Sequence, residues 1–238
     1  MWRLAQFGVD ELEEASSALR GAGEGAHTME ETADRVVRIL HENLVDDTGG
    51  PATALVRFYK THPFGSLPDA TRAFAAGLGG DERLDDRTPC LTLIGTVGIE
   101  ADWCDRHRSH GHQAIPLPSP QAVERLPMVS KMLSDLGLDT VALGDPSPAE
   151  ALQLHHRTYD VFFVPDAAGS PWVPAQDFVH DYEIRSVVGI GGVLPSGDVF
   201  VVIMFTHVLL DEDVVDDLKS LAPAVKAAVI PTTFRVFA

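Results

Sequence analysis

The chain has 238 residues, with 18 Lys and Arg against 35 Asp and Glu, so its formal net charge at pH 7 is −17. This acidic balance argues against nonspecific binding to nucleic acids or anionic membranes, because both require a surplus of positive charge on the protein. Hydrophobic residues make up 45% of the chain, which is typical of a globular protein and too high for a disordered acidic tail. The unusual feature of the composition is its ten histidines.

Neither a targeting segment nor a membrane span is predicted. Acidic residues from Asp10 to Glu14 interrupt the start of the chain too early for the apolar stretch of a signal peptide. The most apolar run, residues 186–208, is broken by glycines, Pro195 and Asp198, which favours a β-hairpin over a membrane helix. The two cysteines are too few for a disulfide framework. We therefore expect a reduced, cytoplasmic protein.

The N-terminal residues are expected to form a separate unit. Residues 9–20 have the composition of a helix, and Gly21, Gly23 and Gly25 end it, because glycine loses the most backbone entropy on ordering. Residues 1–25 are therefore predicted to be an N-terminal helix and hinge, followed by one domain over residues 26–238.

Hydrophobic periodicity predicts the elements that follow. They are a helix over 28–45, a strand over 52–59, a short helix over 69–78, a strand over 90–97, helices over 123–136 and 148–159, and a short strand over 161–164. Residues 100–120 should form a long ordered loop, and such loops in compact domains are usually functional.

The last third of the chain has the clearest pattern. Residues 186–194 and 199–207 are apolar at nearly every position, so each should be a central strand covered on both faces. Pro195 lies in the turn between them. The helix that begins near Asp211 contains Pro223, which should kink the helix or restart it after Ser220.

The long loop carries a candidate metal set. Cys104, His107 and His110 offer a thiolate and imidazoles, the ligands that zinc, iron and copper prefer. This pattern suggests a transition metal or haem site. However, the spacing matches no standard zinc module, and Arg106 and Arg108 would repel a cation. The alternative is a polar loop that lines or covers a pocket.

The same loop carries candidate ligand-binding residues. His110 and His112 can donate hydrogen bonds to an acidic or carbonyl-bearing ligand, and their charge can change near neutral pH. Trp103 could provide a stacking face, and Arg106 a fork for a planar anion; alternatively, Trp103 only caps the sheet. The complete predicted ligand-binding set is Trp103, Arg106, His110, His112, Trp172 and Arg185.

The order of these elements and two stretches of sequence resemble the GAF domain, a sensory module related to PAS domains. The likeness lies in residues 31–59 and 184–230, where Arg185-Ser186-Val187-Val188, the turn at 194–198 and the acidic helix start follow the closing pattern of the family. It covers most of residues 27–232. The resemblance implies an α+β fold with a central antiparallel sheet and helices on both faces.

A narrower likeness concerns the GAF-like region that precedes the kinase core in some bacterial sensor histidine kinases. It rests on the runs Gly111-His112-Gln113-Ala114-Ile115-Pro116-Leu117-Pro118-Ser119, Gly169-Ser170-Pro171 and Leu194-Pro195-Ser196-Gly197-Asp198. The chain carries no phospho-acceptor helix and no ATP-binding domain. The resemblance therefore implies sensing and signalling without kinase activity.

Together these patterns predict a cytoplasmic small-molecule sensor of bacterial signal transduction. Its pocket should lie on one face of the sheet, under the 100–120 loop and the helices of 123–160, with the terminal helices on the other face. GAF relatives commonly dimerise through such helices, so we expect a homodimer and a signalling protein partner.

Two alternative functions remain open at this point. One is a haem or metal sensor that uses the loop over residues 103–112. The other is a thiol enzyme, since some GAF-fold proteins reduce free methionine sulfoxide with cysteine thiols. Cys104 has cationic neighbours that could lower its pKa, whereas Cys90 opens a buried strand, where a thiol is usually inert. The cysteine arrangement of those reductases is not reproduced here.

Overall fold

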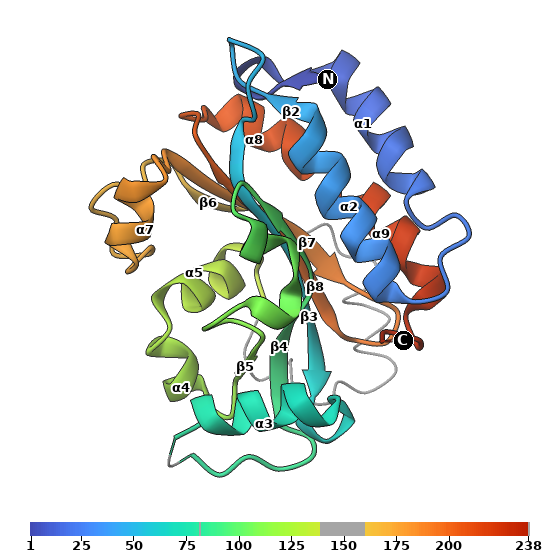
Figure 1. The fold of residues 1–238 in the computed structure, drawn as a ribbon, viewed down its shortest axis with the longest axis vertical. Coiled ribbons are helices and arrows are strands. Elements are labelled where there is room, and N and C mark those ends of the chain that lie inside the picture. Colours follow the sequence, from blue (N-terminus) through green and yellow to red (C-terminus); the bar gives the residue numbers. More distant parts are fainter. Residues whose placement is uncertain (81, 139–159, 238) are drawn as a thin grey trace.

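The computed structural model describes residues 1–80, 82–138 and 160–237. Its centre is a six-stranded antiparallel sheet in the order β5-β4-β3-β8-β7-β6, with helices on both faces (Figure 1). This confirms the predicted α+β class and the antiparallel sheet. The predicted helix over 148–159 lies outside the described residues.

The strands follow the apolar runs of the sequence. Those of the large sheet are β3 (Thr53–Pro63), β4 (Pro89–Gly98), β5 (Ala114–Pro116), β6 (Phe162–Val164), β7 (Ser186–Val193) and β8 (Val199–Thr206). Every residue of β7 and β8 is buried, which confirms the prediction of two central strands covered on both faces. A second, small sheet pairs β1 (Trp2–Arg3) in parallel with β2 (Leu44–Val45).

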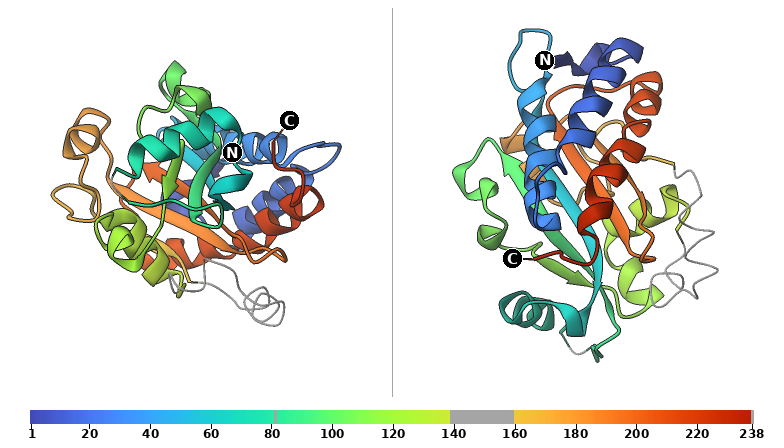
Figure 2. Two further views of the ribbon diagram at one scale, coloured as in Figure 1. Left: turned by 90° about the horizontal axis from the view of Figure 1, so that it is seen from below. Right: turned by 90° about the vertical axis from the view of Figure 1, so that its right-hand side faces the viewer.

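One face of the sheet is covered by the helices nearest the two ends of the chain (Figure 2). These are α1 (Val9–Gly21), α2 (Met29–Asn43), α8 (Glu212–Lys219) and α9 (Ala222–Val229). Thr28 begins α2 as an N-cap, since its side chain accepts a hydrogen bond from the Glu31 amide at 3.2 Å. The predicted restart of the last helix after Ser220 is confirmed, because α9 carries Pro223 in its first turn, where a missing N–H is tolerated.

These helices lie close to the sheet. A side chain at Gly95 of β4 would place its Cβ 2.8 Å from the backbone of Ala33 in α2, so only glycine permits this approach. The pairing of β3 with β4 shifts register next to this glycine, between Phe58 and Tyr59. Ala15 and Leu19 of α1 are buried in the same core as α9. The predicted N-terminal helix is therefore present, and it packs against the helices that cover the sheet.

The other face carries shorter elements. They are α3 (Asp69–Leu78), α4 (Pro120–Glu124), α5 (Pro127–Asp135), α7 (Gln176–Asp181) and the 3-10 turns η3 (Ala101–Cys104) and η4 (Arg106–Arg108) of the long loop. Three further 3-10 turns are η1 (Leu4–Gln6), η2 (Phe64–Ser66) and η6 (Ile230–Thr232). The predicted single helix over 123–136 is wrong in this respect, because Pro127 begins a new helix rather than continuing α4. In the described part of the chain, no helix is long and apolar enough to cross a membrane.

Candidate functional site

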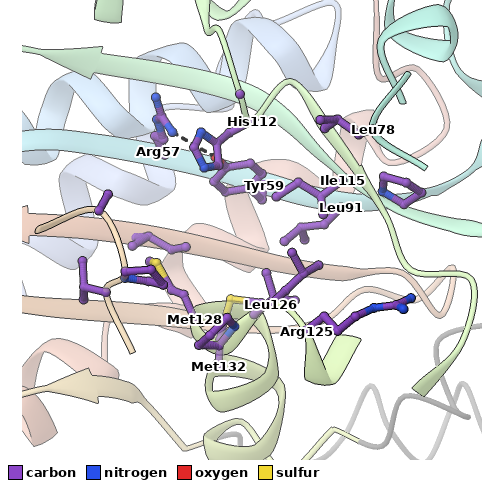
Figure 3. Close-up of a pocket in the computed structure, with 18 of the residues that line it drawn as sticks. Arg57, Tyr59, Leu78, Leu91, His112, Ile115, Arg125, Leu126, Met128 and Met132 are labelled. Atoms are coloured by element: carbon purple, nitrogen blue, oxygen red, sulfur yellow. Dashed lines mark hydrogen bonds between the residues drawn. The ribbon is translucent and has the colours of Figure 1, made fainter. Parts of the chain in front are cut away.

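A cavity of about 560 Å³ lies on the face of the sheet opposite α1, α2, α8 and α9 (Figure 3). Its floor is formed by strands β3, β4 and β8, and one wall by the start of α5. The 100–113 loop and the segment over 173–178 bound it at the side. Most lining side chains are apolar, and the volume falls within the range of about 300–1,000 Å³ that is typical of small-molecule sites.

Strand β3 supplies the floor through the alternation of its side chains. Leu55, Arg57 and Tyr59 line the cavity, whereas Val56 and Phe58 are buried in the helix-covered core. This follows from the period of a strand, in which successive side chains point to opposite faces. One strand thus forms both the floor of the cavity and part of the core behind it.

Three polar side chains lie close together in the lining of this apolar cavity. The guanidinium of Arg57 donates a hydrogen bond to the Tyr59 hydroxyl at 3.3 Å, and the His112 ring lies beside them (Figure 3). The Nε of Arg57 is buried and has no hydrogen-bond partner among the described residues. Partial loss of water around the ring, together with the nearby charge of Arg57, lowers the pKa of His112 below its ordinary value, although the residue keeps part of its surface exposed. His112 is therefore neutral at pH 7.

One ion pair lies among the lining residues of the cavity, and both of its side chains reach solvent. Arg125 of α4's C-terminus pairs with Glu82. The Arg125 side chain keeps 65% of its surface exposed, so this pair adds little stability. Its two charges offset each other, which leaves Arg57 as the cation without an acidic partner among the described lining residues.

An aromatic cluster closes one side of the cavity. The ring of Trp103 lies 4.5 Å from that of Tyr182 and 5.6 Å from that of Phe178, centroid to centroid. Phe178 meets the edge of Phe205 at 5.3 Å. The Thr96 hydroxyl donates a hydrogen bond to the Trp103 carbonyl at 2.9 Å, which fixes η3 against the sheet. Trp103 thus packs against the sheet and also lines the cavity. The two roles considered from the sequence, a cap on the sheet and a stacking face for a ligand, are therefore compatible with one position.

The structure brings Trp103 and His112 of the predicted ligand-binding set to the cavity, and places the other members elsewhere. Arg106 turns to the helix-covered face, where it pairs with Glu30 of α2. Its guanidinium also lies over a phenyl ring near the C-terminus. The remaining three, His110, Trp172 and Arg185, are exposed and do not line the cavity.

The predicted metal set is not assembled. Residues 1–80, 82–138 and 160–237 contain no group of three His, Cys, Asp or Glu side chains that could share a metal ion. The Cys104 thiol points toward the Gly98 carbonyl, 3.4 Å away, and packs at the edge of the helix-side core. His107 and His110 are exposed. Cys104 and Trp103, although adjacent in sequence, therefore face opposite sides of the sheet.

Sequence reasoning missed Arg57, Tyr59 and the methionines of α5, Met128 and Met132, which also line the cavity. The signal for Arg57 was available, since it is a cation within the predicted apolar strand over 52–59, between Val56 and Phe58. Burying a charge costs free energy unless an opposite charge or hydrogen bonds compensate for the lost water. A cation in a buried strand is therefore a candidate for ligand binding.

No protein-family model matches the chain, and no curated protein matches it. Function is therefore inferred from the cavity and its polar groups.

The two thiols should react very differently in the folded protein. Cys90 is fully buried in β4, and burial raises the pKa of its thiol to about 12, so it is neither accessible nor ionised at neutral pH. Cys104 is only half-buried. In a native titration with Ellman's reagent, we expect one thiol per chain to react, and none in a Cys104→Ser variant. Release of a second thiolate equivalent without denaturant would contradict this assignment.

Proposed function

We propose that this chain is a GAF-like sensory domain that binds a small molecule in the cavity on one face of its sheet and acts in bacterial signal transduction. The observation that carries the proposal is the cavity itself: about 560 Å³, lined by apolar side chains with a few convergent polar groups. This combination is characteristic of small-molecule sites. The order of helices and antiparallel strands supports the GAF-like assignment, which rests on resemblance.

The packing around β3 suggests how occupancy of the cavity would be signalled. Phe58 stacks on Phe200 at 5.9 Å between ring centroids, within the core that α1, α2, α8 and α9 cover. A ligand that shifts Arg57 or Tyr59 moves the same strand that holds Phe58. A ligand with different affinities for two arrangements of this strand would shift the population between them. The terminal helices would then carry the change to a second copy or to a signalling partner.

Binding of a neutral apolar dye tests the proposed cavity function. N-phenyl-1-naphthylamine fluoresces when it leaves water, and we expect saturable binding of one dye molecule per chain. Met128→Trp should abolish this binding, because the larger side chain fills the space between α5 and the sheet. Leu209→Trp is the matched control, since Leu209 is exposed and lies outside the cavity. The proposal fails if the wild-type protein binds no dye saturably, or if Met128→Trp binds it as well as the control does.

A further inference from the structure

The cavity holds a cationic donor whose hydrogen bonds are incomplete. Arg57 lies on β3, the third strand of the sheet from the β5 edge, and its side chain is half-buried. Its buried Nε has no partner among the described residues, while one terminal nitrogen reaches Tyr59. A buried donor without an acceptor is unfavourable, and more so when it carries charge. The buried Nε is closed to a ligand, but the guanidinium also has terminal N–H groups that Tyr59 does not take, and Arg57 lines the cavity.

The arrangement of donors matches a planar anion. The guanidinium presents its N–H groups in a fixed fork, which binds carboxylates in a bidentate manner. The Tyr59 hydroxyl oxygen already accepts from Arg57, so its own proton remains to be donated. Within the described part of the chain, no acceptor takes that proton. Arg57 and Tyr59, which lie side by side in the cavity lining, therefore offer neighbouring donors (Figure 3).

The charge of the site sets the charge of the ligand. Arg125 is offset by Glu82, and His112 is neutral at pH 7, so Arg57 supplies one net positive charge to the described lining. One cation balances a singly charged carboxylate. A phosphate monoester carries about −1.5 to −2 at pH 7 and would leave part of its charge unpaired in an apolar surrounding.

The remainder of the cavity lining is apolar and suits the nonpolar part of a ligand. Leu55, Leu91 and Ile203 form the floor, and Met128 and Met132 face them from α5. Methionine side chains are flexible and adapt to ligands of different shape. The polar trio is thus surrounded by apolar surface, and a ligand held there must carry its polar group at one end.

We propose that the cavity binds an apolar monocarboxylic acid, whose carboxylate is held by Arg57 and Tyr59 and whose apolar part lies between β3, β4, β8 and α5. This inference rests on the proposed function, since it names the ligand class of the same cavity. His112, a neutral neighbour of Arg57, can donate its one ring N–H to the carboxylate.

Competition with the neutral dye tests the ligand class. The probes are decanoate and decyl phosphate, each below its micelle concentration, and 1-decanol below its solubility limit, all at pH 7.5. We expect decanoate to displace the dye at least about tenfold more strongly than 1-decanol, because a hydrogen-bonded charge adds a factor of about 10 to 100. Decyl phosphate should bind more weakly than decanoate. If 1-decanol or decyl phosphate equals decanoate while the dye still binds one per chain, the carboxylate assignment is overturned and the cavity function stands.

Substitution of Arg57 localises the preference. Arg57→Gln should lose about 10- to 100-fold in decanoate affinity, and much less in its affinities for 1-decanol and the dye, so the preference for decanoate over 1-decanol should disappear. Arg57→Lys should retain part of the preference, because the charge remains but the fork is lost. Arg185→Gln removes one positive charge from an exposed position outside the cavity and should change nothing. Equal losses in Arg57→Gln and Arg185→Gln would overturn the proposal.

Two results separate failure of this inference from failure of the proposed function. Absence of dye binding to the wild-type protein defeats both. Dye binding without any preference for decanoate over 1-decanol defeats the inference alone. This comparison uses only the wild-type protein, so it decides the question even if Arg57→Gln does not fold, as judged by its circular dichroism spectrum.

Discussion

Replacing Asp198 by alanine should lower the free energy of unfolding by about 3 kcal/mol, because it leaves a buried ammonium without its anion. Lys60 is only 2% exposed, and its Nζ donates to the Asp198 carboxylate at 2.7 Å. Asp198 lies in the turn between β7 and β8 and keeps 25% of its side-chain surface exposed. Partial access of water to the carboxylate places the expected loss at the lower end of the range for broken buried pairs.

The double variant Lys60→Met/Asp198→Ala distinguishes charge from turn geometry. It should recover most of the lost stability in urea unfolding, because no buried charge then lacks a partner. Ser196→Ala, which removes only a hydroxyl that donates to Asp198, should cost less than Asp198→Ala. A double variant as unstable as Asp198→Ala would show that Asp198 acts through the turn.

The same pair predicts a pH dependence. Burial lowers the pKa of Lys60 below its ordinary value, and Asp198 opposes this shift. Without Asp198, the folded state should release the Lys60 proton at a lower pH than the unfolded state does. The unfolded state then binds more protons over that interval, so the stability of Asp198→Ala should rise toward that of the wild-type protein as the pH increases toward 10.

Acid should destabilise the protein through His62, by roughly 3 kcal/mol between pH 7 and pH 4. His62 is 5% exposed, and neither ring nitrogen has a hydrogen-bond partner among the described residues. Burial, and then the positive charges of Lys60 and Arg106, lower its pKa to about 3, against 6.5 in a model peptide. In the unfolded chain His62 therefore binds a proton below pH 6.5, whereas in the folded chain it does so only near pH 3. Stability is lost as the pH falls through this interval.

His62→Phe isolates this contribution. Phenylalanine keeps the ring that packs 5.3 Å from Phe237, and it cannot be protonated. The free energy of unfolding should therefore decrease less on acidification in His62→Phe than in the wild-type protein, with a difference of roughly 3 kcal/mol at pH 4. His180→Phe is the control, since the His180 side chain is 91% exposed. Parallel acid curves for the wild-type protein and His62→Phe would refute the prediction.

Much of the sheet could be predicted from the sequence, because buried strands and breaks leave strong local signals. The hairpin over residues 186–206 and the strand over 89–98 are apolar runs with clear ends. The break at Pro223 follows from a rule of local chemistry. The same rule applies to Pro127, where the sequence interpretation placed a continuous helix.

The site was harder to predict, because it depends on which way side chains point from irregular backbone. Within the 100–113 loop, Trp103 and His112 reach the cavity, whereas Cys104 and Arg106 reach the helix-covered face. Proximity in sequence therefore grouped residues that the fold separates. Arg57 lies more than 40 residues from the loop in sequence and joins His112 only through the pairing of strands.

Short outer strands bear on how copies of this chain can associate. β5 and β6, at the two margins of the large sheet, are three residues long each, and β5 ends at Pro116, which has no backbone N–H to donate. A margin of this kind offers few free backbone groups to a strand of another molecule, and thereby resists continuous growth into fibres. Self-association by strand addition is disfavoured for the same reason. A homodimer of this chain would therefore have to form through helices, where side chains rather than backbone groups select the partner.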